Sequence, residues 1–96
     1  MRVLLKQPSD DKFRQIVVPN DLDTLQEIVG GYIEQVTLAM DVALICNEEG
    51  RIIGQDPNCV YMGKAFVGPI LIVGIDGEEY TDCPWSVTMA NKGITK

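Results

Sequence analysis

Few side chains in this sequence belong to the types that carry catalytic chemistry, and those few are not spaced for it. The chain has no histidine, so it lacks the usual base of a hydrolytic triad and a common companion ligand of zinc. Its cysteines, Cys46, Cys59 and Cys83, lie far apart and form no C-x-x-C pair. Gly63 and Gly68 have the spacing of a phosphate loop, but the Lys-Ser/Thr that should follow is missing. The sequence therefore argues against an enzyme and predicts neither a cofactor nor a metal.

The other reactive side chains fit structural or solvated roles. The cysteines are expected to be free and mostly buried thiols in a reducing compartment. The carboxylates of Asp76–Glu79 and Asn47–Glu49 lack the spacing of a calcium loop. Both segments are therefore expected to be solvated tips of hairpins.

Glu34 is a carboxylate on a predicted strand face that is otherwise apolar. A buried carboxylate destabilises a protein by several kcal/mol unless it is paired. Two interpretations follow. Either a β-bulge near Gln35 turns Glu34 outward, or Glu34 lies at the edge of a pocket, beside Tyr32 and facing Arg51 or Asn47.

Polar side chains gather at the strand ends and at the turns over 47–50 and 55–58, where a junction between subunits could bring them together. Arg51 and Lys64 are the only cations in this region. An arginine can bind a phosphate or a carboxylate through two parallel hydrogen bonds. A small polar or nucleotide ligand is therefore expected, with these binding residues: Tyr32, Glu34, Asn47, Arg51 and Asn58.

The elements that position these residues are predicted to form a single α+β domain over residues 1–96. A helix is expected over Leu22–Val29, capped by Asp21 or Asp23 and stopped by Gly30-Gly31. A mixed or mostly antiparallel sheet of roughly four to six strands should pack on this one short helix. The strands are expected over 1–6, 13–18, 32–38, 42–46 and 70–75, with Glu78–Thr81 after an Asp-Gly hairpin turn.

The remaining segments are less regular. Residues 51–54 are expected to return briefly as a strand, and residues 59–62 fit either a short edge strand or one helical turn. No element is assigned between Gly63 and Gly68. The tail over 84–89 fits a short helix.

Two of the predicted strands, 42–46 and 70–75, are apolar on both faces. Such strands lie centrally in a sheet that is covered on both sides. One short helix covers one side, so either the tail around Trp85 or a second subunit must cover the other. We therefore predict a homo-oligomer, with a dimer as the simplest form.

The composition is that of a folded, acidic protein. Eight Lys and Arg stand against 14 Asp and Glu, giving a net charge of −6, so direct binding to nucleic acid is not expected. No apolar run reaches the roughly 18 residues that span a bilayer, and the N-terminus lacks the features of a signal peptide. We expect a cytoplasmic protein without membrane contact.

Several motifs together resemble those of a known family. The segments MRVLLKQP, LQEIVGGYIEQVTL, ICNEEGRIIGQDPN and VGPILIVG are similar to a family of small domains of unknown function from bacteriophages and mobile elements of Gram-positive gut bacteria. The resemblance extends from Met1 to about Asp82 and is carried by Gly30–Glu34, Asn47–Gly50 and Pro57-Asn58. It implies action in a bacterial host cell and brings no catalytic residue with it.

Three functions remain open at this stage. The first is a binding protein that sequesters a small polar molecule, such as a nucleotide-derived immune signal of the host, without transforming it. The alternative is an acidic, protein-binding inhibitor of a host factor that mimics nucleic acid. The third is a structural or packaging accessory. The absence of an activated nucleophile favours the first, and an anionic ligand would need the cations Arg51 and Lys64.

Overall fold

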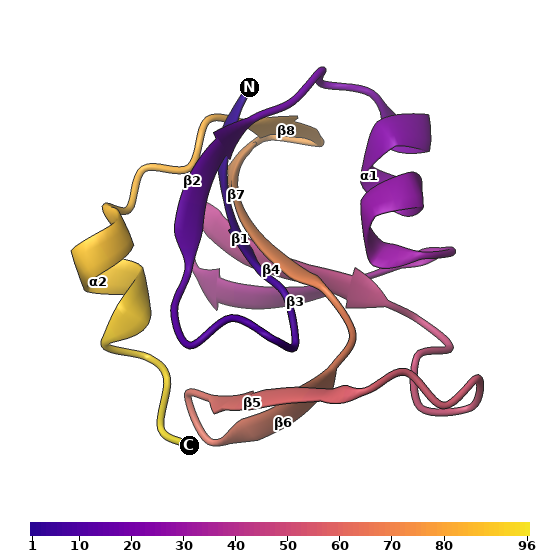
Figure 1. The fold of residues 1–96 in the computed structure, drawn as a ribbon. Helices are drawn as coiled ribbons and strands as arrows, with labels where there is room; N and C mark the ends of the chain where they lie inside the picture. The colour runs from indigo at the N-terminus through magenta and orange to yellow at the C-terminus, as the bar shows by residue number, and fades with distance from the viewer.

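A six-stranded sheet lies at the centre of the computed structural model, which describes residues 1–96 (Figure 1). Its strands are β1 (Arg2–Lys6), β2 (Arg14–Val17), β3 (Ile33–Ala39), β4 (Val42–Asn47), β7 (Ile70–Asp76) and β8 (Glu79–Thr81). The order is β2-β1-β7-β4-β3, β8 also pairs with β7, and all pairings are antiparallel. The remaining elements are the hairpin of β5 (Pro57–Tyr61) and β6 (Lys64–Val67), and the helices α1 (Leu22–Val29) and α2 (Val87–Asn91). The predicted α+β class with a mostly antiparallel sheet is confirmed.

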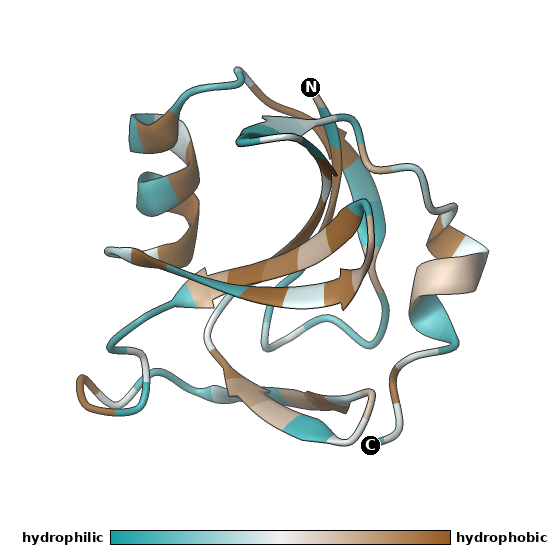
Figure 2. Cartoon of the chain, turned by 180° about the vertical axis from the view of Figure 1, so that it is seen from behind, coloured by the Kyte–Doolittle hydropathy of each residue, from teal (hydrophilic) through white to brown (hydrophobic).

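The two central strands, β4 and β7, are buried on both faces, as their apolar sequences predict (Figure 2). One face of the sheet packs on α1 through Leu25 and Val29. The opposite face packs on the β5–β6 hairpin and on α2, through Tyr61, Phe66 and Ala90. Figure 1 shows this arrangement, with α1 and α2 on opposite sides of a strongly curved sheet and the hairpin below it.

Both faces of the central strands are thus covered within one chain. Trp85 and Val87, in the tail, pack against the same cluster as Ala90. The sequence analysis proposed that either the tail or a second subunit covers the second face. In the structure the tail covers it, together with the β5–β6 hairpin. The uncovered apolar face from which a homo-oligomer was predicted does not exist, so association would need a different surface.

Helix α1 begins and ends at the predicted residues. The side chain of Asp21 accepts a hydrogen bond of 2.7 Å from the backbone N–H of Thr24, and the bonds to Thr24 lower the pKa of Asp21. At the other end Gly30 has φ of +87°, a left-handed conformation that glycine adopts without strain. Its N–H donates to the carbonyl of Gln26 at 2.8 Å. The chain can therefore turn directly from α1 into β3.

The segment between β4 and β7 differs most from the prediction. Residues 51–54 form successive turns and not a returning strand, because the N–H of Ile53 bonds back to Glu49 and that of Gly54 to Arg51. Residues 59–62, for which a strand or a helical turn was expected, lie mainly in β5. The unassigned residues that follow form β6, so the chain has a hairpin that the sequence analysis missed.

One further prediction needs correction, and one is confirmed. The irregularity in β3 lies between Thr37 and Ala39, not near Gln35, so a bulge does not turn Glu34 away from its expected face. The short helix expected in the tail is present as α2, where Ser86 accepts a hydrogen bond from the Met89 N–H at 3.1 Å. Neither helix is long and apolar enough to cross a bilayer.

Candidate functional site

A hollow of about 380 Å³ lies where the ends of β3 and β4 meet the β5–β6 hairpin. Its size is within the range of small-molecule sites, which is roughly 300–1,000 Å³. Three parts of the chain form it: the β3–β4 pair, the loop that follows β4, and β6. The lining residues are Glu34, Cys46, Asn47, Glu48, Arg51, Ile52, Lys64, Ala65, Phe66 and Val67.

The loop after β4 is held in place by Gln55. The Gln55 N–H donates to the carbonyl of Gly50 at 2.9 Å, and its side-chain amide donates to the carbonyl of Val29 at 3.0 Å. A β-carbon at Gly68 would lie 2.1 Å from the Gln55 side chain, so the close packing here requires glycine. Gln55 therefore ties the loop to the end of α1, packs against Gly68 just after β6, and so restricts the position of the loop that carries Arg51.

Glu34 and Lys64 face each other across the hollow. Glu34 is the register partner of Cys46, so both side chains lie on the face of the sheet that the hairpin covers. The Lys64 ammonium is 3.7 Å from a Glu34 carboxylate oxygen, and the two side chains are 55% and 44% exposed. Lys64 also lies over the Phe66 ring, 5.6 Å from its centroid. The carboxylate is thus paired and half solvated, which removes the cost of burying it alone.

Arg51 is exposed and only partly engaged. One terminal nitrogen, Nη2, donates to the carbonyl of Ala65 at 2.7 Å, which anchors the side chain to β6. A guanidinium has five N–H groups in a fixed fork, so most of its donors are left for other acceptors. Arg51 and Lys64 therefore offer two cations on one hollow, and Glu34 and Glu48 offer two carboxylates.

Asn47 lies in the wall of the hollow, but its side chain has structural partners. It is buried, its Nδ2 donates to the carbonyl of Val29 at 3.3 Å, and its Oδ1 accepts from the Glu49 N–H at 2.8 Å. These bonds join the end of α1 to the turn after β4. Asn47 therefore shapes the site and has little capacity left for a ligand.

Cys46 lies beside the charged groups at the floor of the hollow. Burial, together with the nearby Glu34 carboxylate, raises the pKa of its thiol to about 11, while Lys64 and Arg51 oppose the shift. A thiol with this pKa is protonated at neutral pH, and the thiolate is the nucleophilic form. All three cysteines are free, as predicted.

The predicted site residues thus separate into two groups. Glu34, Asn47 and Arg51 line the same hollow, as the pocket interpretation of Glu34 expected. Tyr32 lies outside it, with an exposed side chain. Asn58 lies in a neighbouring hollow of about 400 Å³ that shares Arg51 with the first.

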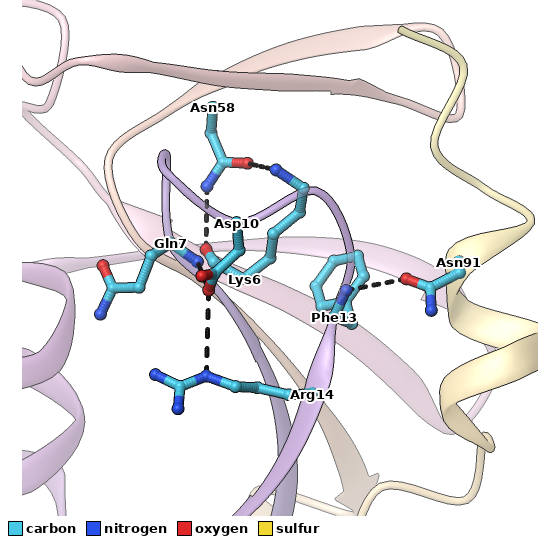
Figure 3. A network of polar contacts seen from close by, with 7 residues as sticks. All are labelled: Lys6, Gln7, Asp10, Phe13, Arg14, Asn58 and Asn91. Atoms are coloured by element: carbon cyan, nitrogen blue, oxygen red, sulfur yellow. Dashed lines mark hydrogen bonds and ion pairs between the residues drawn. The ribbon is translucent and has the colours of Figure 1, made fainter.

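The amide of Asn58 is fully engaged in holding the fold together (Figure 3). Its Oδ1 accepts from the Lys6 ammonium at 2.8 Å, and its Nδ2 donates to the carbonyls of Lys6 and Gly68 at 2.9 Å and 2.7 Å. Lys6 is only 3% exposed. Asn58 therefore joins β1 to the hairpin and satisfies a buried charge.

Several of the lining residues missing from the predicted set come from β6, and one of them, Lys64, had been named only as a nearby cation. Lys64 and Phe66 complete the hollow, but the sequence assigned no element to their segment. A signal was present in the short apolar run Ala65–Val67, which lies between Gly63 and Gly68 and includes an aromatic and a β-branched residue. Sequence reasoning could not tell which strand this hairpin would face.

Comparison with known proteins gives one match. A family model described as a domain of unknown function (DUF3846) matches residues 1–90, nearly the whole chain. No curated protein and no solved structure matches the sequence. The match agrees with the predicted membership of an uncharacterised domain family, and it assigns no role to any residue of the hollow.

Proposed function

The chain belongs to the DUF3846 family of domains of unknown function, and from the geometry of the hollow we propose that it binds a small anionic ligand without transforming it. The observation that carries the proposal is that Arg51 and Lys64, from separate segments, line one hollow with an apolar wall at Phe66. Most of the N–H donors of Arg51 have no partner within the chain. A phosphate or carboxylate is the group that such a fork binds best.

The charges of the hollow also restrict the ligand. Glu34 and Glu48 face the same space as the two cations, so a compact polyanion would meet repulsion from the carboxylates. A ligand with one anionic group and several hydrogen-bond donors fits better, because the donors can reach Glu48 while the anion reaches Arg51. A nucleotide with a single phosphate has this distribution, and its base could lie on the apolar side chains of Phe66 and Ile52.

Binding without reaction is supported by the state of the nearby thiol. Cys46 is the one conventional nucleophile on the hollow, and its raised pKa keeps it protonated at neutral pH. The lining residues include no serine, threonine or tyrosine hydroxyl and no histidine. These side chains favour a protein that holds its ligand over one that attacks it.

The resemblance to phage and mobile-element domains supports a more specific role. A non-enzymatic binder of nucleotides in a bacterial host could sequester a nucleotide-derived immune signal and so blunt the host response. This role requires tight binding, because a sequestering protein competes with the host receptor for the free ligand. It rests on context, whereas the anion site rests on Arg51 and Lys64.

Calorimetry against a panel of cyclic and linear nucleotides tests the proposal. At least one member with a single phosphate should bind. Arg51→Ala should weaken that binding by about 1.5–3 kcal/mol, the usual contribution of a hydrogen bond to a charged group. The matched control is Arg14→Ala, which removes an exposed arginine whose only ion pair is a 3.9 Å contact with Asp10 (Figure 3). Its affinity should match that of the wild type.

Two results would contradict the proposal. One is the absence of binding across the whole panel, which would favour the acidic, protein-binding inhibitor. The other is equal affinity in the Arg51 variant and the wild type, which would place the ligand elsewhere.

A further inference from the structure

Arg51 lies at the boundary between two hollows. The first, of about 380 Å³, is the candidate site described above, and the second, of about 400 Å³, is lined mainly by the β5–β6 hairpin. Both volumes are within the range of roughly 300–1,000 Å³ that takes small molecules. The two hollows share Arg51 and three residues of β6, Ala65, Phe66 and Val67. An anion bound at Arg51 would therefore have space for a substituent on each of two sides.

The second hollow lies on the face of the hairpin that points away from the sheet. Tyr61 and Phe66 are buried against the sheet. Successive residues of a strand point to opposite faces, and cross-strand partners point to the same face. The side chains of Val60 and Ala65, which are cross-strand partners, therefore point away from the sheet. Val60 lines the second hollow and not the first, so the two spaces lie on different sides of β6.

The edge of β6 beside Arg51 offers a backbone donor. The Val60 N–H donates to the carbonyl of Lys96, and the Val60 carbonyl accepts from the Thr95 N–H, both at 2.8 Å, so these groups point away from β6. Because Val60 and Ala65 are partners in an antiparallel ladder, the N–H and C=O of Ala65 point away from β5. The Ala65 carbonyl accepts from Arg51 at 2.7 Å. The Ala65 N–H lies on the same side and is left for an anion.

The charges around Arg51 favour an anion with a single negative charge. The Lys64 ammonium is already 3.7 Å from the Glu34 carboxylate, and Glu48 lines the same hollow, so Arg51 is the main cation left for a ligand. A phosphate monoester carries about 1.5–2 negative charges at neutral pH. A phosphodiester carries one, because both of its other oxygens are esterified. A diester therefore meets less repulsion from the two carboxylates.

The two hollows and the preference for one charge together define a class of ligand. Building on the proposed binding function, we infer that the ligand is a dinucleoside monophosphate, whose phosphodiester lies at Arg51 and the Ala65 N–H with one nucleoside in each hollow. The first nucleoside can donate hydrogen bonds to Glu48, and the second packs on Val60. Each further nucleotide would add a phosphate, which a chain with a net charge of −6 repels.

Calorimetry with three related probes tests this inference, in an adenine, a guanine, a cytosine and a uracil series. The probes are the mononucleotide, its methyl phosphodiester and the dinucleoside monophosphate. The methyl ester has the single charge of a diester but no second nucleoside. In at least one series the dinucleoside monophosphate should bind about tenfold more tightly than the methyl ester, because the second nucleoside covers apolar surface in the second hollow. The methyl ester should bind at least as tightly as the mononucleotide.

Two matched substitutions separate the hollows. Val60→Gln places a neutral polar side chain in the second hollow, so it should lower the affinity for the dinucleoside monophosphate by about three- to tenfold. The affinity for the methyl ester should not change, which also shows that the variant is folded. Ile52→Gln is the control, because Ile52 lines only the first hollow and is 82% exposed. It should weaken the binding of both probes by the same factor.

The outcomes distinguish this inference from the proposed function. Equal affinity for the methyl ester and the dinucleoside monophosphate in every series overturns the inference, while binding of the mononucleotide leaves the proposed function standing. A Val60 variant that keeps the full preference for the dinucleoside also overturns it, since the second nucleoside would then lie elsewhere. If none of the probes binds, both the inference and the proposed function fail.

Discussion

Two cationic side chains from outside the β5–β6 hairpin donate hydrogen bonds to it, and they differ in burial and in how many of their donors are engaged. Lys6 is 3% exposed, and its ammonium donates to the side chain of Asn58 at 2.8 Å. Arg51 is exposed and donates through one nitrogen to the carbonyl of Ala65 at 2.7 Å. The Lys6 ammonium is thus buried and has a hydrogen-bond partner in the hairpin. Arg51 lies at the edge of the hollow, and most of its N–H donors have no partner in the chain.

The difference shows what separates a structural residue from a candidate ligand-binding residue. The deciding property is whether its polar atoms already have hydrogen-bond partners in the protein, and not its residue type. Both groups combine a cation with polar partners, and Arg51 and Asn58 were predicted together from neighbouring polar turns. A buried donor or acceptor must be satisfied by the protein itself, and once satisfied it is unavailable to a ligand. A half-exposed donor has no such requirement.

The largest expected effect on stability comes from breaking the buried Lys6–Asn58 contact. Asn58→Ala removes the acceptor of the Lys6 ammonium and leaves that charge buried, so the free energy of unfolding should fall by about 3 kcal/mol. Urea denaturation measures it. Asn20→Ala is the control, because the Asn20 amide donates to the carbonyl of Tyr80 in an exposed setting. An equal loss of unfolding free energy in the two variants would mean that the Lys6 ammonium is not buried away from water.

The pH dependence of stability should reveal two buried groups whose folded-state pKa values are raised, Cys46 and Tyr61. Burial raises the pKa of Cys46 from 9.0 to about 11 and that of Tyr61 from 10.0 to about 12. The unfolded chain therefore loses these protons first. Stability is fully present below pH 9 and falls as the pH rises through 11 and 12, by up to about 1.4 kcal/mol per pH unit for each group.

Denaturation midpoints between pH 8 and 11 check this slope. Tyr61→Phe should flatten only its upper part, since the phenylalanine cannot ionise and the thiols remain. The substitution also removes the 2.7 Å hydrogen bond from the Tyr61 hydroxyl to the carbonyl of Ala90, which lowers stability at every pH. A slope that does not change in this variant would show that Tyr61 is not the titrating group.

One substitution applied to both cations compares them directly. Lys6→Met keeps the length of the side chain but leaves the Oδ1 of Asn58 without its donor, so it should lower the free energy of unfolding by about 1–3 kcal/mol. Arg51→Met, at an exposed site, should change it by less than about 0.5 kcal/mol. Thermal and urea denaturation of the two variants give the comparison. The comparison between the two cations is contradicted if Arg51→Met lowers the free energy of unfolding more than Lys6→Met does.

The smallest effect is expected at the pair that closes the hollow. Glu34→Gln removes a half-exposed ion pair, whose contribution to stability is typically below about 1 kcal/mol. The same change frees Lys64 for an anion, so nucleotide affinity should rise a few-fold. A fall in affinity, measured by calorimetry, would mean that the Glu34 carboxylate itself holds the ligand.

The predicted parts of the fold are those in which local chemistry decides the structure. The Asp21 cap, the Gly30 stop and the Asp76-Gly77 hairpin turn each act over a few residues, and the apolar runs of β4 and β7 require a central position. The β5–β6 hairpin was not recognised because its residues do not alternate clearly between polar and apolar types. Its place over the sheet is a tertiary property.

The candidate site was predicted only in part, because local chemistry can be read from the sequence but contacts between distant segments cannot. Glu34 and Arg51 were identified by their chemistry, and the structure brings them to one hollow. Asn58 was grouped with them because it lies at a polar turn. Its actual partner, Lys6, is 52 positions away in the chain, so no local pattern could reveal that its amide is engaged.

Nuclear magnetic resonance of the labelled chain, titrated with linear and cyclic nucleotides, tests the central claim most directly. Backbone amide shifts report where a ligand lies, with no substitution that could disturb the fold. We expect saturable shifts at Glu48–Ile52 and Lys64–Val67, and none beyond background at Lys6 and Asn58. Shifts centred on Lys6 and Asn58, or no saturable shift with any nucleotide, would contradict the account.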